Sequence, residues 1–151
     1  MPFFLSLHEI SKNQLNPSLI GGKAKALAQL YQNKFLVPNG FVITTEFFNL
    51  FSKEDNISGN DLAIIFKYID ACSPLGFVAV RSSASIEDSG EQSFAGQFET
   101  VLNVKKEDVS GAITKCWQSL YSPRVSIYAK QRNDERKMAV LIQEMIYPEV
   151  S

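Results

Sequence analysis

Apolar residues recur at helical spacing in three segments of the chain. Residues 62–69 carry them three and four positions apart, a spacing that lines one face of a helix. The same spacing predicts a helix that begins near Lys23, directly after a Gly-Gly turn, and a longer helix over residues 109–120. A fourth, short helix is expected in the segment TEFFNLF, for which Thr44 and Thr45 are candidate N-caps.

Extended segments lie between these helices. Residues 41–45 and 77–81 are rich in β-formers and predict two short strands, and the alternation over 97–104 predicts a strand with two different faces. The most apolar run, MAVLIQEMI at residues 138–146, predicts a central strand. A Ser-Pro pair predicts the start of one more helix over residues 124–131. This irregular mixture favours an α+β fold with a mixed or antiparallel sheet and flanking helices.

Composition adds bounds to this picture. The chain has 151 residues, 45% of them hydrophobic and 21% charged, which is typical of one soluble domain. Its formal net charge of -1 excludes a global electrostatic footprint for nucleic acid or an anionic membrane. Cys72 and Cys116 form no CxxC pair, so we expect free buried thiols in a reducing compartment. With no basic leader and no apolar run of about 20 residues, the protein is expected to be cytoplasmic.

Two cationic segments are candidates for an anion site. The first is Gly21-Gly22-Lys23, where helix N-terminal amides and flexible glycines favour a phosphate. It is not a Walker A loop, because Pro17 stands where the first glycine belongs and Ala24 replaces the serine or threonine. An ordinary turn before a helix explains the same residues, and the spacing alone does not decide between the two.

The second cationic segment is centred on Arg81, which follows an apolar strand and precedes two serines. A guanidinium at the carboxyl end of a strand, among small donors, is suited to a phosphate or carboxylate ligand. A surface salt bridge with Glu87 or Asp88 is the alternative. These acidic residues, together with Glu91, do not follow the EF-hand pattern, so a solvated loop is expected there and not a metal cage.

Other chemistry is poorly supported by the sequence. His8 is the one histidine and has no cysteine or acidic ligands at metal-binding spacing around it, so we expect a surface or capping role. No GxSxG motif is present to suggest a hydrolase. We therefore predict no metal site within these residues.

Five segments in order resemble a known family. They are GGKAKALAQLY, VPNGFVITTEFF, VAVRSSASIEDSGEQSFAGQFETVLNV, CWQSLYSPRVSIYAKQ and MAVLIQEMIYPEVS. Together they resemble the N-terminal nucleotide-binding domain of the phosphoenolpyruvate synthase and pyruvate, phosphate dikinase family, a domain that rifampicin phosphotransferases share. The resemblance runs from residue 20 onward, and VRSSA followed by SFAGQ is its most specific part.

This resemblance implies the first subdomain of an ATP-grasp-like nucleotide-binding domain. It implies that Lys23 and Arg81 contact the ATP phosphates and serve as the catalytic clamp of the complete enzyme, with the serine-rich and glycine-rich loop as a flap. The remaining implied ATP-binding residues are Gly96, Gln97 and Thr100 beside the phosphates, and Gln143, Glu144, Met145 and Ile146 along the adenine.

The resemblance also implies a larger protein. We expect residues 1–151 to form a single domain, the N-terminal part of an ATP-grasp domain that continues beyond residue 151, where Mg²⁺ ligands, a phosphohistidine domain and an acceptor-binding domain follow. The whole protein would then move phosphate from ATP through a carrier histidine to pyruvate or a related acceptor, while this chain alone would not turn over substrate. The alternative is a stand-alone, non-catalytic module with the same fold that binds a nucleotide or a partner. The sequence does not identify the acceptor, the oligomeric state, or whether this half binds ATP alone.

Overall fold

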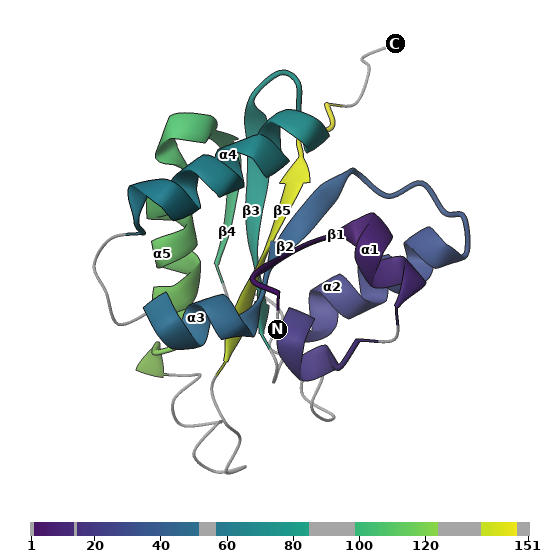
Figure 1. The fold of residues 1–151 in the computed structure, drawn as a ribbon, viewed down its shortest axis with the longest axis horizontal. Helices are drawn as coiled ribbons and strands as arrows, with labels where there is room; N and C mark the ends of the chain where they lie inside the picture. The colour runs from purple at the N-terminus through teal and green to yellow at the C-terminus, as the bar shows by residue number, and fades with distance from the viewer. Residues whose placement is uncertain (1, 14, 52–56, 85–98, 124–136, 148–151) are drawn as a thin grey trace.

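The computed structural model describes residues 2–13, 15–51, 57–84, 99–123 and 137–147, which form one five-stranded sheet with helices on both faces (Figure 1). All paired strands are antiparallel, in the order β1-β2-β5-β3-β4. The strands are β1 (Phe4–Ser6), β2 (Gly40–Ile43), β3 (Phe77–Ala84), β4 (Thr100–Lys105) and β5 (Met138–Glu144). The apolar strand β5 occupies the centre, as its composition predicts.

Helices α1 and α2 lie on one side of the sheet, and α3, α4 and α5 lie on the other (Figure 1). Their bounds are α1 (Leu7–Lys12), α2 (Pro17–Gln32), α3 (Thr45–Phe51), α4 (Gly59–Cys72) and α5 (Val109–Ser119), with a 3₁₀ turn at Lys106–Asp108 before α5. The expected α+β fold with flanking helices is therefore confirmed, and the sheet is antiparallel.

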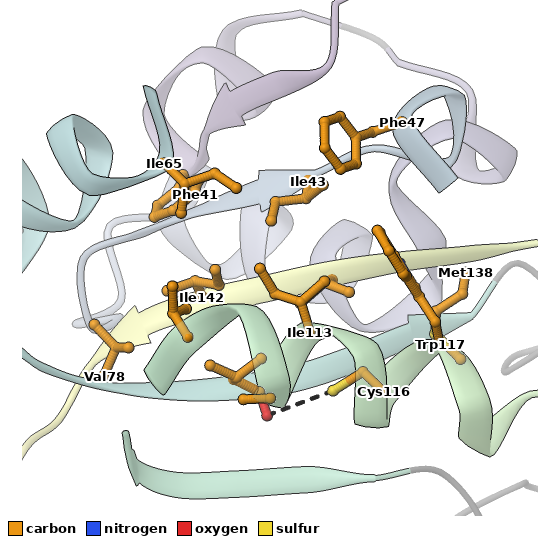
Figure 2. Close-up of a cluster of buried hydrophobic side chains, with 14 of the residues drawn as sticks. Phe41, Ile43, Phe47, Ile65, Val78, Ile113, Cys116, Trp117, Met138 and Ile142 are labelled. Atoms are coloured by element: carbon orange, nitrogen blue, oxygen red, sulfur yellow. Dashed lines mark hydrogen bonds between the residues drawn. The ribbon is translucent and has the colours of Figure 1, made fainter. Parts of the chain in front are cut away.

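Two hydrophobic cores result from this layering. Residues of β5 alternate between them: Met138, Val140 and Ile142 face the larger core, whereas Ala139 and Leu141 face the smaller one under α1 and α2. Both faces of β5 are covered, which explains why its sequence is continuously apolar. Figure 2 shows the larger core, where side chains of α3, α4 and α5 meet those of the sheet.

The predicted helices at 62–69 and 109–120 are confirmed. Ile65 and Ile69 of α4 are fully buried, and α5 buries Ile113 and Trp117 as its spacing requires. The N-terminal strand β1 and helix α1 were not predicted, because a strand of three residues is too short to show a period.

Three local predictions need correction. β3 does not end at Arg81 but continues to Ala84, because residues 82–84 pair with β5. Helix α2 begins at Pro17, and the predicted start near Lys23 is where the helix resumes after a break. Thr44 and Thr45 do not cap α3 with their hydroxyls, which donate instead to the carbonyls of Pro2 and Ser18 (both 2.8 Å).

Several predictions fall outside the described residues: the helix over 124–131 and the acidic loop with its neighbours Gly96 and Gln97. None of the helices in the described part of the chain has the length and hydrophobicity of a membrane span.

Candidate functional site

A break in α2 brings the Gly-Gly segment against β3. Gly21 has φ +80° and ψ 166°, a left-handed conformation that interrupts the helix and that glycine adopts without a side-chain penalty. A Cβ built on Gly21 would lie 2.0 Å from the backbone oxygen of Ser83, so only glycine permits this close approach. The predicted turn is thus a packing contact between the start of a helical segment and a strand.

Lys23 extends from this helical segment to the same strand. Its Nζ donates a hydrogen bond to the carbonyl oxygen of Ser82 at 3.2 Å. The side chain is half-buried, so its charge lies at the protein surface beside β3 and not deep in the core. Lys23 is far from Arg81 in the sequence, but it binds the carbonyl of Ser82, the residue that follows Arg81 in β3.

Arg81 lies in the middle of β3, and its side chain contacts β5. Its Nη1 donates to Oε1 of Gln143 at 3.2 Å, and Nε2 of Gln143 donates in turn to the carbonyl of Pro38 at 3.2 Å. Gln143 is buried, with 3% of its surface exposed, so this chain of hydrogen bonds fixes its amide in one orientation. The predicted salt bridge partners of Arg81, Glu87 and Asp88, lie outside the described residues.

The sheet pairing places these polar groups on one face. Arg81 is opposite Leu141 on β5 and opposite Thr100 on β4. Because cross-strand partners point to the same side of a sheet, Arg81 and Thr100 share the face on which Leu141 packs below α2. Thr100 is exposed and Arg81 is partly exposed, which leaves a polar, accessible area beside the helix-covered part of this face.

The end of β5 is tied to the segment that leads into β2. Glu144 accepts a hydrogen bond from the Asn39 amide through its carboxylate (3.0 Å) and donates its own amide to the Asn39 carbonyl (2.8 Å). The Met145 amide donates to the Phe77 carbonyl at 3.4 Å. The amides of Glu144 and Met145 therefore donate within the chain, so a base bound here would have to use carbonyl oxygens or the amide of Ile146, whose side chain is 60% exposed.

The two cysteines are free and buried, as predicted. Burial raises the pKa of Cys116 to about 12, with the charge of Glu99 adding to the rise and that of Lys23 opposing it. Burial, with Glu144, raises the pKa of Cys72 to about 11. The Cys116 thiol lies 3.8 Å from the Val80 carbonyl (Figure 2), a core contact that suits a protonated thiol and not a nucleophile.

His8 has a surface position, as the sequence predicts. It is exposed, and its Nδ1 lies 3.3 Å from the Tyr31 hydroxyl. Both residues border a cavity of about 260 Å³ between α1 and α4 that also contacts Tyr68 and Cys72. Arg81 and Lys23 do not line this cavity, so the cationic residues lie apart from it.

A metal centre does not fit the described residues. Nowhere in this part of the chain do three or more His, Cys, Asp or Glu side chains gather as a metal ion would require. The chemistry that these residues support is the binding and charge neutralisation of an anion by Lys23 and Arg81.

The structure therefore brings Lys23, Arg81, Thr100 and Gln143 to one face of the sheet and places Glu144 at the end of β5. Gly96 and Gln97 lie outside the described residues. Sequence reasoning missed the roles of Ser83 and Asn39. The available signal was the pair of serines after Arg81, which stand within a strand although serine is not a strong β-former.

Comparison with known proteins gives this geometry a family context. Residues 60–151 match the family described as pyruvate phosphate dikinase, AMP/ATP-binding domain. This match confirms the expected ATP-grasp-like nucleotide-binding fold. A probable phosphoenolpyruvate synthase of Archaeoglobus fulgidus is 34% identical over 97% of this chain and 25% of its own length.

Two further relatives extend the range of named activities. The phosphoenolpyruvate synthase of Aeropyrum pernix is 34% identical over 94% of this chain and 23% of its own length. The rifampicin phosphotransferase of Bacillus subtilis is 33% identical over 97% of this chain and 21% of its own length. The chain thus spans about a quarter or less of these curated relatives.

Proposed function

Because the chain belongs to the pyruvate phosphate dikinase AMP/ATP-binding domain family, we propose that it binds ATP on the sheet face that carries Arg81 and Thr100. Lys23 and Arg81 are the residues that contact the triphosphate. Gln143, Glu144, Met145 and Ile146 line the adenine, and Thr100, with Gly96 and Gln97, lies beside the phosphates.

One observation supports this assignment: a cation from α2 is bound to the strand residue that directly follows a second cation, Arg81. Lys23 reaches the Ser82 carbonyl from α2, and Arg81 is the preceding residue of β3. Cations on separate elements are suited to brace a polyphosphate from two directions, which a single basic loop does not do. The bond of Arg81 to the neutral Gln143 amide leaves the positive charge of the guanidinium available to a phosphate oxygen.

The order of the groups along the sheet matches the order of the parts of a nucleotide. Glu144 pairs with Val78 at one end of β3, Arg81 lies in the middle, and Ser83 packs on the Gly21 break at the other end. Val78 and Ser83 are five residues apart, roughly 17 Å at about 3.3 Å per residue. An extended ATP bound along β3 would have its base near Glu144 and its phosphates near Arg81 and Lys23.

The clamp has a chemical role in a complete enzyme. Phosphoryl transfer depends mainly on positioning and on neutralising charge that develops on the transferred group, so Lys23 and Arg81 would orient the triphosphate and stabilise that charge. Mg²⁺ would neutralise phosphate charge in the complete enzyme, and its ligands are expected in the part of the nucleotide-binding domain that follows residue 151.

The names of the relatives suggest the reaction of the whole protein. It would transfer phosphate from ATP through a carrier histidine to pyruvate or a related acceptor, in the manner of a phosphoenolpyruvate synthase-like phosphotransferase. The carrier and acceptor sites would belong to further domains, and a cytoplasmic location fits a reaction that consumes ATP.

The test is a titration of the ¹⁵N-labelled chain with ATP and with adenosine, followed by two-dimensional amide NMR, which detects binding as weak as about 1 mM. Arg81→Ala should weaken ATP binding by roughly 10- to 150-fold, the loss of one charge-assisted hydrogen bond of about 1.5–3 kcal/mol, and leave adenosine binding unchanged. Lys25→Ala, which removes an exposed cation two residues from Lys23, is the matched control and should change neither. Equal affinities of the wild-type chain for ATP and adenosine would contradict the phosphate clamp.

A further inference from the structure

The hydroxyl of Ser83 occupies the break in α2. It donates a hydrogen bond to the Ile20 carbonyl at 2.8 Å and accepts one from the Ala24 amide at 3.1 Å. Ser83 is fully buried, so both bonds form away from water. One side chain of β3 thus joins the two helical pieces that Gly21 separates.

This arrangement replaces a missing cap. The residue at the start of the resumed helix is Gly21, which has no side chain to accept a hydrogen bond from the first-turn amides. A longer residue does not fit there, because its Cβ would collide with Ser83. The strand therefore supplies the capping oxygen from outside the helix, to the Ala24 amide.

Lys23 lies between the two residues that Ser83 binds. Its backbone is held by the Ser83 bonds to Ile20 and Ala24, and its ammonium is held by the neighbouring Ser82 carbonyl. Because Ser83 belongs to the same strand as Arg81, the position of the lysine is set relative to the arginine by a rigid strand and not by a loop.

The geometry points to Ser83 as a positioning residue for triphosphate binding: through Ile20 and Ala24 it fixes Lys23 at the distance from Arg81 that the phosphates require. This inference rests on the proposed nucleotide site. Ser83 is not expected to touch the nucleotide, since its hydroxyl is buried and both of its bonds go to the helix.

The decisive variant is Ser83→Ala, which leaves the Ile20 carbonyl and the Ala24 amide without this partner. We expect ATP binding to weaken by about three- to tenfold, with adenosine binding unchanged. Ser73→Ala is the matched control: Ser73 is also a buried serine, and its hydroxyl donates to the Phe77 carbonyl (2.7 Å) at the end of α4, away from Lys23. A general loss of stability would appear in both variants, whereas the loss of ATP selectivity should appear in Ser83→Ala alone.

A double-mutant cycle separates positioning from stability. In a Lys23→Met background, Ser83→Ala should have no further effect on ATP binding, because there is no ammonium left to position. Additive losses, or equal losses for ATP and adenosine, would overturn the inference. Thermal unfolding and a dispersed NMR spectrum establish that each variant is folded. If Ser83→Ala does not fold, Ser83→Cys keeps the side-chain shape with a somewhat larger atom. It replaces the hydroxyl by a weak donor and acceptor, and it should show the same selective loss.

The outcomes also distinguish the inference from the proposed function. If Lys23→Met does not change ATP affinity, the phosphate clamp itself is wrong. If Lys23→Met weakens ATP binding and Ser83→Ala does not, the clamp stands and Ser83 has only a structural role. Failure of both Ser83 variants to fold would likewise assign Ser83 to stability alone and overturn the inference.

Discussion

Arg81 and Gln143 are joined by a hydrogen bond of 3.2 Å between β3 and β5, on the sheet face proposed to bind ATP. Gln143 also donates to the Pro38 carbonyl, so the arginine is connected through one amide to the segment that leads into β2. The proposed phosphate-binding arginine and the proposed adenine-binding strand are therefore not independent parts, and a change at Gln143 should affect both.

Replacing Gln143 by leucine should destabilise the fold. The substitution removes the partner of the Pro38 carbonyl and of one guanidinium group in a partly buried site, which costs about 0.5–1.5 kcal/mol of unfolding free energy per hydrogen bond. Urea denaturation measures this loss. Gln118→Leu on the exposed side of α5 is the control and should change the unfolding free energy by less than about 0.5 kcal/mol. Equal stability of the two variants would show that the Gln143 bonds contribute nothing.

Glu144→Ala should weaken the binding of ATP and adenosine by the same factor. The carboxylate holds the Asn39 amide at the end of the sheet proposed to bind the base, and both ligands contain the base. The expected pattern differs from that of Arg81→Ala, which affects ATP alone. Glu107→Ala removes an exposed carboxylate before α5 and serves as the control in the same NMR titrations. A selective loss of ATP binding in Glu144→Ala would place the base elsewhere.

Gly21→Ala should be strongly destabilising. The backbone of Gly21 lies in a region that is essentially restricted to glycine and costs an alanine about 1–3 kcal/mol, and the contact of its Cβ with the Ser83 backbone at 2.0 Å adds about 1–3 kcal/mol. Alanine variants of two other glycines separate these contributions when their free energies of unfolding are measured by heat or urea. Gly76 has φ +82°, but a Cβ added there would meet no atom within 4 Å, so Gly76→Ala should show the conformational cost alone. Gly59→Ala, with open space and no positive φ, should be neutral or slightly stabilising.

The buried thiols should make stability fall at alkaline pH. The pKa of Cys116 rises from its ordinary value of 9.0 to about 12 in the folded chain, so the folded state retains a proton that the unfolded state has lost. This contribution is complete below pH 9 and is lost as the pH rises from about 9 towards 12. Urea unfolding between pH 8 and 10.5 should show a falling free energy, with a smaller slope in Cys116→Ala. An unchanged slope in that variant would exclude Cys116 as a cause of the loss of stability at alkaline pH.

Local pattern was sufficient for the elements that bury one regular face. The apolar positions of α4 and α5 repeat at helical spacing over three turns, and the core needs that face whichever neighbour covers it. The continuous apolar sequence of β5 predicted its central position, because both of its faces are covered. Strand β1, with three residues and one partner, carries no such repeat and depends on β2 for its existence.

The candidate site divides in the same way. The charge and neighbouring residues of Lys23 and Arg81 indicated a candidate anion site, and the resemblance to a nucleotide-binding family implied that the anion is ATP. Their geometry was not readable locally. The sequence alone suggested that Arg81 ends a strand, whereas pairing with β5 carries β3 on through both serines.

The sequence by itself determined the α+β class, the main helices, the central strand and the family of this chain, because these depend on residue periodicity and on specific motifs within short segments. Only the tertiary structure decided that Lys23 meets Ser82, that Ser83 closes the break at Gly21 and that Arg81 holds Gln143. Along the sequence, Lys23 and Ser82 are 59 residues apart, Ser83 and its partner Ile20 are 63 residues apart, and Arg81 and Gln143 are 62 residues apart. Such contacts depend on how a helix packs on a sheet and on which strands are neighbours, and no local pattern of side chains encodes that arrangement.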